Sequence, residues 1–328
     1  MQKKIRALVF LIPFFAAIFS PFACAQTNPA EDRAALFNYD PKAPLDIQET
    51  AVENKGGVTL HTISYASPKA GRVPAYLVVP AGRGPFPAII FMHWGQGNRS
   101  AFLAEALLYG RAGAISLLID APFERPEPWY RALGFDINNP DNDSAVYIQS
   151  IVELRRAIDL LAARPDVDQK RIGYIGLSFG GHIGGVLASV DKRIKTYILM
   201  GGPASATDML RKEDFAGLVQ FRKSVPKEKF EGYLQRLAPL DAIHYIGRAA
   251  PSPVFFQFAR QDKFISERQA QSYVEAASSP KEVKWYDVGH EFNDVDSLVD
   301  RADWLRKEIG INSVRSILLE KLNAKDKR

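Results

Sequence analysis

The chain has 328 residues, of which 47% are hydrophobic and 24% charged, and its formal net charge is +5. This composition can supply a large buried core and excludes an intrinsically disordered chain. Three of the five net charges come from Lys3, Lys4 and Arg6 at the extreme N-terminus. The basicity therefore gives no ground for a nucleic-acid-binding function.

Residues 1–25 have the pattern of a secretory signal peptide. The three cations precede an apolar run, and Ala23-Cys24-Ala25 offers a cleavage site flanked by small residues. We expect the mature chain to begin at Gln26, to be exported to the periplasm or the medium, and to have no stable membrane association. An uncleaved anchor and a lipoprotein modified at Cys24 are the alternatives. Cleavage removes the only cysteine, so a disulfide or a cysteine nucleophile is excluded.

The next segments lead into an alternating pattern. Residues 26–70 form a polar lead-in with a first strand at 58–66, and a second strand is expected at 72–80. Further on, continuous apolar runs predict strands at 88–94, 114–122, 171–178, 194–202, 252–259 and 282–288. Helical patterns between and after them cover 99–113, 144–164, 180–190, 266–277 and 297–309. Such alternation indicates an α/β domain, residues 71–310, with a mostly parallel sheet between helices.

Two segments depart from this alternation. Residues 203–251 are charged, contain aromatic side chains and have mainly helical patterns. The segment is too long for an ordinary connection, so we expect a helical cap or lid inserted in the domain. Residues 311–328 are expected to form a C-terminal helical tail.

The stretch YIGLSFGGH places Ser178 between an apolar strand and a helix, with Gly176 and Gly180 on either side. A G-x-S-x-G sequence in this context is typical of a turn that presents a serine nucleophile. The alternative is that the glycines serve only close packing between strand and helix.

A serine nucleophile needs a base, and the base needs an orienting acid. Asp262 follows one late strand and His290 follows the last one, in the chain order expected for this arrangement. We therefore predict a triad of Ser178, His290 and Asp262. Among the other aspartates, Asp241 and Asp294 are expected to be ordinary surface residues and Asp287 to be structural. Among the other histidines, His61 lies in the N-terminal β-rich region, His182 is expected to serve packing or to be an oriented polar neighbour, and His244 to lie at the surface or an interface.

The segments FPAIIFMHWGQG, RIGYIGLSFGG, FARQDKFIS and VGHEF resemble serine α/β-hydrolases. The similarity is to dienelactone hydrolase and to the catalytic domains of prolyl-oligopeptidase-type enzymes, over residues 71–309. The resemblance implies an oxyanion hole made by the N–H of Phe179 and an N–H of Trp94 or Gly95, with His93 opening the loop. Trp94 stands where the family usually has glycine, and dienelactone hydrolase has cysteine as its nucleophile.

Two further regions are candidates for the substrate pocket. Trp129 and Tyr130 lie in a proline- and aromatic-rich loop and are expected either to line the pocket or to cover the core. The cap aromatics have the same two interpretations, and the cap cations are expected to form a solvated face. The sequence has no metal-ligand spacing and no phosphate-binding glycine loop, so no metal and no cofactor are expected.

The sequence thus predicts an exported serine hydrolase that cleaves small-molecule carboxylic esters through an acyl-enzyme. A serine peptidase acting on short peptides and a non-catalytic ligand-binding protein of the same fold are the alternatives. No nucleic-acid partner is expected, and the sequence does not determine the oligomeric state.

Overall fold

A computed structural model describes residues 33–318 of the chain. The predicted signal peptide and residues 319–328 of the predicted tail lie outside this range, while 314–318 are helical. In the described part the strands form one sheet in the order β1-β2-β3-β5-β4-β6-β7-β8-β9. They are β1 (Gln48–Asn54), β2 (Val58–Ala66), β3 (Arg72–Pro80), β4 (Phe86–Met92), β5 (Ile115–Ile119), β6 (Val167–Leu177), β7 (Thr196–Met200), β8 (Val254–Ala259) and β9 (Lys281–Tyr286).

The sheet is parallel from β5 to β9 and antiparallel at the other edge. Strands β1, β2 and β3 pair in antiparallel fashion, and β3 continues antiparallel to β5, with Ala75 opposite Ile119. The parallel part pairs β5, β4, β6, β7, β8 and β9 in that order. The predicted fold class, a mostly parallel α/β sheet, is confirmed. Sequence reasoning missed β1, because every residue of the stretch QETAVEN is exposed and the apolar signal of a strand is absent.

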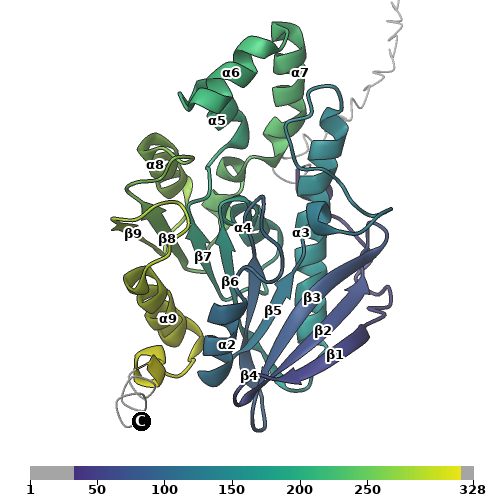
Figure 1. Ribbon diagram of the computed structural model, residues 1–328, viewed down its shortest axis with the longest axis vertical. Coiled ribbons are helices and arrows are strands. Elements are labelled where there is room, and N and C mark those ends of the chain that lie inside the picture. The colour runs from purple at the N-terminus through teal and green to yellow at the C-terminus, as the bar shows by residue number, and fades with distance from the viewer. Residues whose placement is uncertain (1–32, 319–328) are drawn as a thin grey trace, which may run out of the picture.

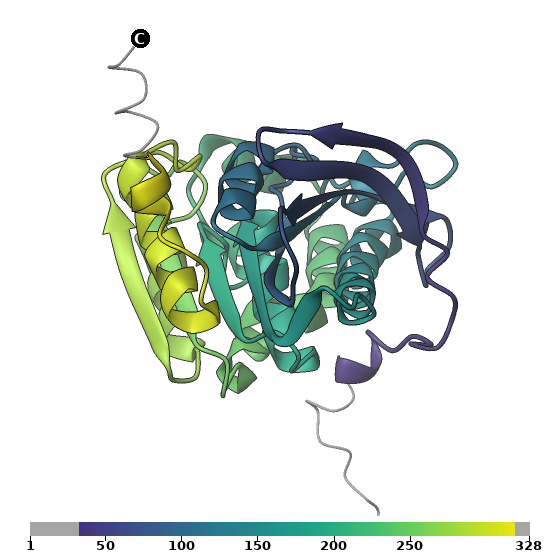
Figure 2. The same ribbon diagram turned by 90° about the horizontal axis from the view of Figure 1, so that it is seen from below.

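Helices cover both faces of the sheet (Figures 1 and 2). Helices α3 (Pro140–Ala162), α4 (Phe179–Val190) and α8 (Glu267–Ala276) pack their apolar residues on one face. Helices α2 (Leu103–Arg111) and α9 (Val295–Ile309) pack on the other. Two apolar cores on opposite faces explain why the central strands are buried along nearly their whole length.

The segment 203–251 contains α5 (Ala206–Lys212), α6 (Ala216–Ser224) and α7 (Lys227–Leu237), followed by three short 3₁₀ turns. Figure 1 shows α6 and α7 at the top of the molecule, beyond the end of the sheet. Helix α7 is anchored on α3, since the Tyr233 hydroxyl donates to Asp143 Oδ2 at 2.6 Å and Arg236 pairs with Asp141 at 2.5 Å.

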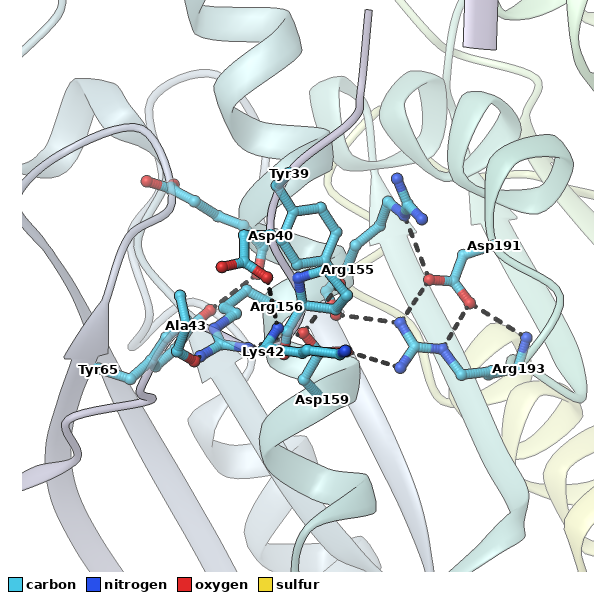
Figure 3. Close-up of polar contacts among 12 residues, drawn as sticks. Tyr39, Asp40, Lys42, Ala43, Tyr65, Arg155, Arg156, Asp159, Asp191 and Arg193 are labelled. Carbon is cyan, nitrogen blue, oxygen red and sulfur yellow. Dashed lines mark hydrogen bonds and ion pairs between the residues drawn. The ribbon is translucent and has the colours of Figure 1, made fainter. Parts of the chain in front are cut away.

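The lead-in is fastened to α3 by a charged network that extends to the residues after α4 (Figure 3). The Tyr39 hydroxyl donates to Asp159 Oδ2 at 2.8 Å, and Arg193 pairs with the other oxygen at 2.6 Å. Arg155 donates to the carbonyl of Phe37 at 2.7 Å. The last of these bonds satisfies a backbone carbonyl of a segment that has little regular structure of its own.

A fully buried ion pair joins the loop after β5 to the middle of α3. The guanidinium of Arg125 forms two hydrogen bonds with Glu153, of 2.5 and 3.1 Å, and both side chains are 0% exposed. Glu153 also accepts from Ser67 at 2.5 Å and from Gln149 at 2.9 Å. Arg125 additionally donates to the carbonyl of Arg72 at 3.0 Å. One carboxylate thus holds together the β2–β3 turn, α3 and the loop that follows β5.

Replacing Glu153 with Gln leaves the Arg125 charge buried without a counter-charge. We expect the free energy of unfolding to fall by about 3–5 kcal/mol, measured by urea denaturation. Glu231→Gln is the matched control, because it removes an exposed partner of Arg211 and should cost less than about 1 kcal/mol. Equal losses in the two variants would contradict the stabilising role of the buried pair.

Candidate active site

Ser178 lies on a strained turn between β6 and α4. Its φ is +56° and its ψ −107°, a conformation that non-glycine residues rarely adopt. The turn is held on both sides, because the Ser178 N–H donates to the carbonyl of Met200 at 2.8 Å and the Ser178 carbonyl accepts from His182 at 2.9 Å. Strain of this kind persists only where the surroundings enforce it, and it is the geometry that exposes a serine hydroxyl at the end of a strand.

The glycines beside Ser178 are required by close backbone contacts. A Cβ at Gly180 would collide with the carbonyl oxygen of Met92, and a Cβ at Gly176 would collide with the backbone of Gly180. The Gly180 N–H also donates to the carbonyl of His93 at 3.2 Å. The glycines therefore serve close packing between strand and helix, and the role of Ser178 as a nucleophile stays a prediction.

Asp262 and His290 are brought together from the ends of β8 and β9. His290 Nδ1 lies 2.7 Å from Asp262 Oδ2, and the side chains are 11% and 2% exposed. The other carboxylate oxygen accepts from the N–H groups of Phe264 at 2.8 Å and Ile265 at 2.9 Å. Because the carboxylate accepts at Nδ1, that nitrogen carries the hydrogen, and Nε2 is left as a proton acceptor.

Ser178 and His290 both reach the segment at the end of β7. Ser178 bonds to Met200, and a Cβ on the next residue, Gly201, would lie 3.3 Å from two atoms of the His290 ring. Among the hydrogen bonds of residues 33–318 there is none between the Ser178 hydroxyl and His290. The structure therefore contains the acid–base pair beside the serine turn, and the complete triad stays a prediction.

The loop after β4 is fixed by His93. Its Nε2 accepts from the Ala121 N–H at 3.1 Å, so its Nδ1 carries the hydrogen that bonds to the Trp94 carbonyl at 2.7 Å. That carbonyl also accepts from Gly97 at 3.0 Å. In a trans peptide the N–H points opposite to the carbonyl, so these two bonds fix the direction of the Gly95 N–H. Burial lowers the pKa of His93 to about 4, which keeps the ring neutral at pH 7.

Phe123 connects the two parts of the predicted oxyanion hole. Its ring lies edge-on to His93, with 5.4 Å between centroids, and edge-on to Phe179 at 5.2 Å. Tyr147 of α3 packs on the other side of Phe179 at 5.4 Å. Neither Phe123 nor Tyr147 was singled out from the sequence, since an aromatic residue in a loop or a helix gives no signal of what it will contact.

The aromatic loop contributes a residue that the sequence did not indicate. Leu133 lies against the oxyanion loop, 3.3 Å from where a Cβ of Gly95 would stand. Trp129 instead packs against Gly71 in the β2–β3 turn, and Tyr130 is 47% exposed. The same loop reaches the cap, where Phe135 and Phe221 have ring centroids 5.9 Å apart.

The remaining histidines are not part of the His290–Asp262 pair. His61 lies on β2 and pairs with Glu49 at 2.6 Å. His182 is buried and its ring nitrogens lie 3.0 and 3.1 Å from the carbonyls of Pro203 and Leu240, which ties α4 to the start and end of the cap. His244 is exposed.

One expectation about the aspartates is wrong. Asp241 is not an ordinary surface residue, because it is 3% exposed and accepts from Ser205 at 2.7 Å and from Thr207. It closes the base of the cap by joining residues at its two ends. Asp287 accepts from Gln261 at 2.9 Å, and Asp294 caps α9 by accepting from Ser297 at 2.7 Å.

Groups of three or more possible metal ligands do not occur among residues 33–318. Over the same residues, none of the helices has both the length and the apolarity that crossing a bilayer demands.

The sequence and the structure match known proteins. Residues 34–307 match the acetyl xylan esterase (AXE1) family. The acetyl xylan esterase of Paenibacillus sp. R4 superposes with a TM-score of 0.70 at 21% identity, covering 85% of this chain and 93% of that one. Acetyl xylan esterase 1 of Thermoanaerobacterium sp. JW/SL YS485 gives 0.71 at 17% identity, with coverage of 86% and 94%.

A curated relative is acyl-coenzyme A amino acid N-acyltransferase 2 of Rattus norvegicus, 27% identical over 164 residues. A second is acyl-coenzyme A thioesterase 3 of Mus musculus, 28% identical over 137 residues. The matches cover 50% and 42% of this chain, but only 35% and 28% of the relatives. The chain thus spans about a third of the length of the curated relatives it matches.

A strained serine at the end of a central parallel strand, on a sheet of this order, defines the chain as a serine α/β-hydrolase, and the family expected from the sequence is confirmed at that level. The chain belongs to the acetyl xylan esterase (AXE1) family.

The buried neutral His93 predicts a loss of stability in acid. The unfolded chain binds a proton at His93 near pH 6.5, whereas the folded chain binds it only near 4. The free energy of unfolding should therefore fall as the pH drops through this window, by about 2–3 kcal/mol from His93. In His93→Gln this part of the pH dependence should disappear, as measured by urea unfolding at pH 7 and pH 4. His61→Gln, on β2 next to the edge strand β1, should keep the wild-type slope, and identical slopes in both variants would refute the prediction.

Proposed function

We propose that the chain hydrolyses carboxylic esters through an acyl-enzyme on Ser178, with His290 as the base and Asp262 as the orienting acid. The observation that carries the proposal is the 2.7 Å bond between His290 and Asp262 next to a serine held at φ +56°. A relay of this kind activates a hydroxyl that is otherwise a weak nucleophile.

In the first half-reaction His290 Nε2 takes the proton of Ser178 as Oγ attacks the ester carbonyl. The oxyanion of the tetrahedral intermediate accepts hydrogen bonds from the Phe179 N–H and from a backbone N–H of the 94–95 loop. His290 then returns the proton to the alcohol oxygen as the carbon–oxygen bond breaks. In the second half-reaction His290 deprotonates a water, which attacks the acyl-enzyme. His290 then returns this proton to Ser178 Oγ as the acyl–oxygen bond breaks, which releases the acid and restores the serine.

For the substrate we propose short acyl esters of sugars, in keeping with the acetyl xylan esterase family and with two acetyl xylan esterases of similar fold. The mature enzyme would take such esters as small-molecule substrates. We also propose export, because of the N-terminal pattern described above.

Ser178→Ala should abolish hydrolysis of p-nitrophenyl acetate above the uncatalysed rate, because the nucleophile is lost. Ser189→Ala on the same helix is the control and should keep wild-type turnover. Asp262→Asn should lower kcat by a factor on the order of 10³–10⁴, since Asn fixes the wrong imidazole tautomer. An active Ser178→Ala variant would refute the proposal.

Two measurements separate the alternatives. A fluorophosphonate should label Ser178 in the wild type and not in Ser178→Ala, whereas a non-catalytic protein of this fold would resist labelling. A serine peptidase would cleave peptide p-nitroanilides with kcat/KM values comparable to those for acetyl esters. We expect this chain to cleave the anilides with much lower kcat/KM values than the esters.

Export predicts a mature N-terminus at Gln26. Intact mass and N-terminal sequencing of protein from the cell envelope and medium would identify it. Replacing Ala23 and Ala25 with large residues should leave the precursor uncleaved. A mature chain that keeps residues 1–25 would contradict the proposal.

A further inference from the structure

Phe264 is an exposed aromatic residue in direct contact with the proposed base. It follows β8 in the turn that begins at Asp262, and 56% of its surface is exposed. Its ring lies edge-on to the imidazole of His290, with 5.0 Å between centroids and 64° between planes. Single exposed apolar residues are common on proteins, but this one lies at the reacting side of the molecule.

The backbone and the side chain of Phe264 have different roles. The backbone N–H donates to Asp262 Oδ1 at 2.8 Å and so helps to fix the carboxylate. The side chain is mostly outside the core, so folding does not require an aromatic ring there. A residue of any type other than proline would supply the N–H, which leaves the ring free to serve another purpose.

The Phe264 ring lies beside the proposed base, which protonates the alcohol part of an ester when that part leaves. Nδ1 of His290 is bonded to Asp262, so the proton returned to the leaving oxygen comes from Nε2. That oxygen must lie about 3 Å from Nε2 when the proton is transferred. The centroids of the two rings are only 5.0 Å apart, so an alcohol group that extends from the leaving oxygen across the imidazole meets the Phe264 ring.

We infer that Phe264 determines specificity for the alcohol part of the ester, by contacting alcohols that contain a six-membered ring. This inference rests on the function proposed above. The exposed phenyl ring offers an apolar surface on which the C–H face of a sugar or cyclohexyl ring, or the face of an aryl ring, loses its contact with water. Alcohols with two or three heavy atoms are too short to contact the Phe264 ring while their oxygen is hydrogen-bonded to His290 Nε2. The inference concerns the alcohol part alone, so a change in the acyl part should not alter the effect of Phe264.

The test measures kcat/KM for ethyl acetate, cyclohexyl acetate, phenyl acetate and a methyl pyranoside monoacetate, with Phe264→Ala compared with the wild type. Taking the variant-to-wild-type ratio for each ester cancels differences in leaving-group reactivity. We expect a loss on the order of tenfold for ring alcohols, expressed mainly in KM, and less than twofold for ethyl acetate. Losses for the pyranoside and cyclohexyl esters alone would identify saturated rings as the preferred alcohols, and losses for phenyl acetate alone would identify aryl rings.

Three controls accompany the substitution. Phe264→Tyr keeps the ring and should restore wild-type ratios. Ile47→Ala removes an exposed apolar residue beside β1, at the opposite edge of the sheet, and should change no ratio. Exchanging acetate for butyrate in the ethyl ester should affect wild type and Phe264→Ala equally.

The outcomes that overturn the inference differ from those that overturn the proposed function. An equal loss for ethyl and ring esters would mean that Phe264 only positions His290, and unchanged ratios would mean that its ring contacts no alcohol. Either result overturns the inference while the esterase stands. A wild type that hydrolyses none of the esters and resists fluorophosphonate would overturn the proposed function and the inference with it.

Discussion

The site depends on the close approach of two backbones, at the point where α4 passes the end of β4. Gly180 comes so near the carbonyl of Met92 that no side chain fits between them, and its N–H bonds to His93. This contact holds the start of α4, directly after the strained Ser178, against the predicted oxyanion loop. Both parts of the predicted catalytic apparatus are thereby positioned by backbone atoms, which cannot change rotamer.

Buried side chains then hold each backbone segment in place. His93 is neutral because it is desolvated, and its two nitrogens fasten the loop after β4 to its own next carbonyl and to the strand end at Ala121. Phe123 contacts both His93 and Phe179, so the two halves of the predicted oxyanion hole share one buried neighbour. Arg125, two residues further on, is fixed by the buried carboxylate of Glu153. The loop after β5 is therefore a support for the site rather than a surface connection.

The acid–base pair is organised differently, since it is assembled from two loops. Asp262 accepts two backbone N–H groups of its own turn as well as the imidazole, so its carboxylate has little freedom to rotate. The ring of Phe264 leaves this turn on the solvent side, where the fold does not constrain its identity. A rigid carboxylate and an unconstrained neighbouring ring allow alcohol preference to vary without disturbing the base.

The sequence by itself determined the strand and helix order, the confirmed hydrolase fold, and Ser178, Asp262 and His290 as candidates, because apolar periodicity and residues at strand ends are local signals. It could not show β1, whose residues are all exposed, nor the burial of Asp241, whose partners Ser205 and Thr207 are more than 30 residues away. Only the tertiary structure placed Leu133 over Gly95, Trp129 against Gly71 and Phe264 on His290. Such contacts form between loops that are far apart in the sequence, and a local sequence pattern does not predict which of these loops will meet.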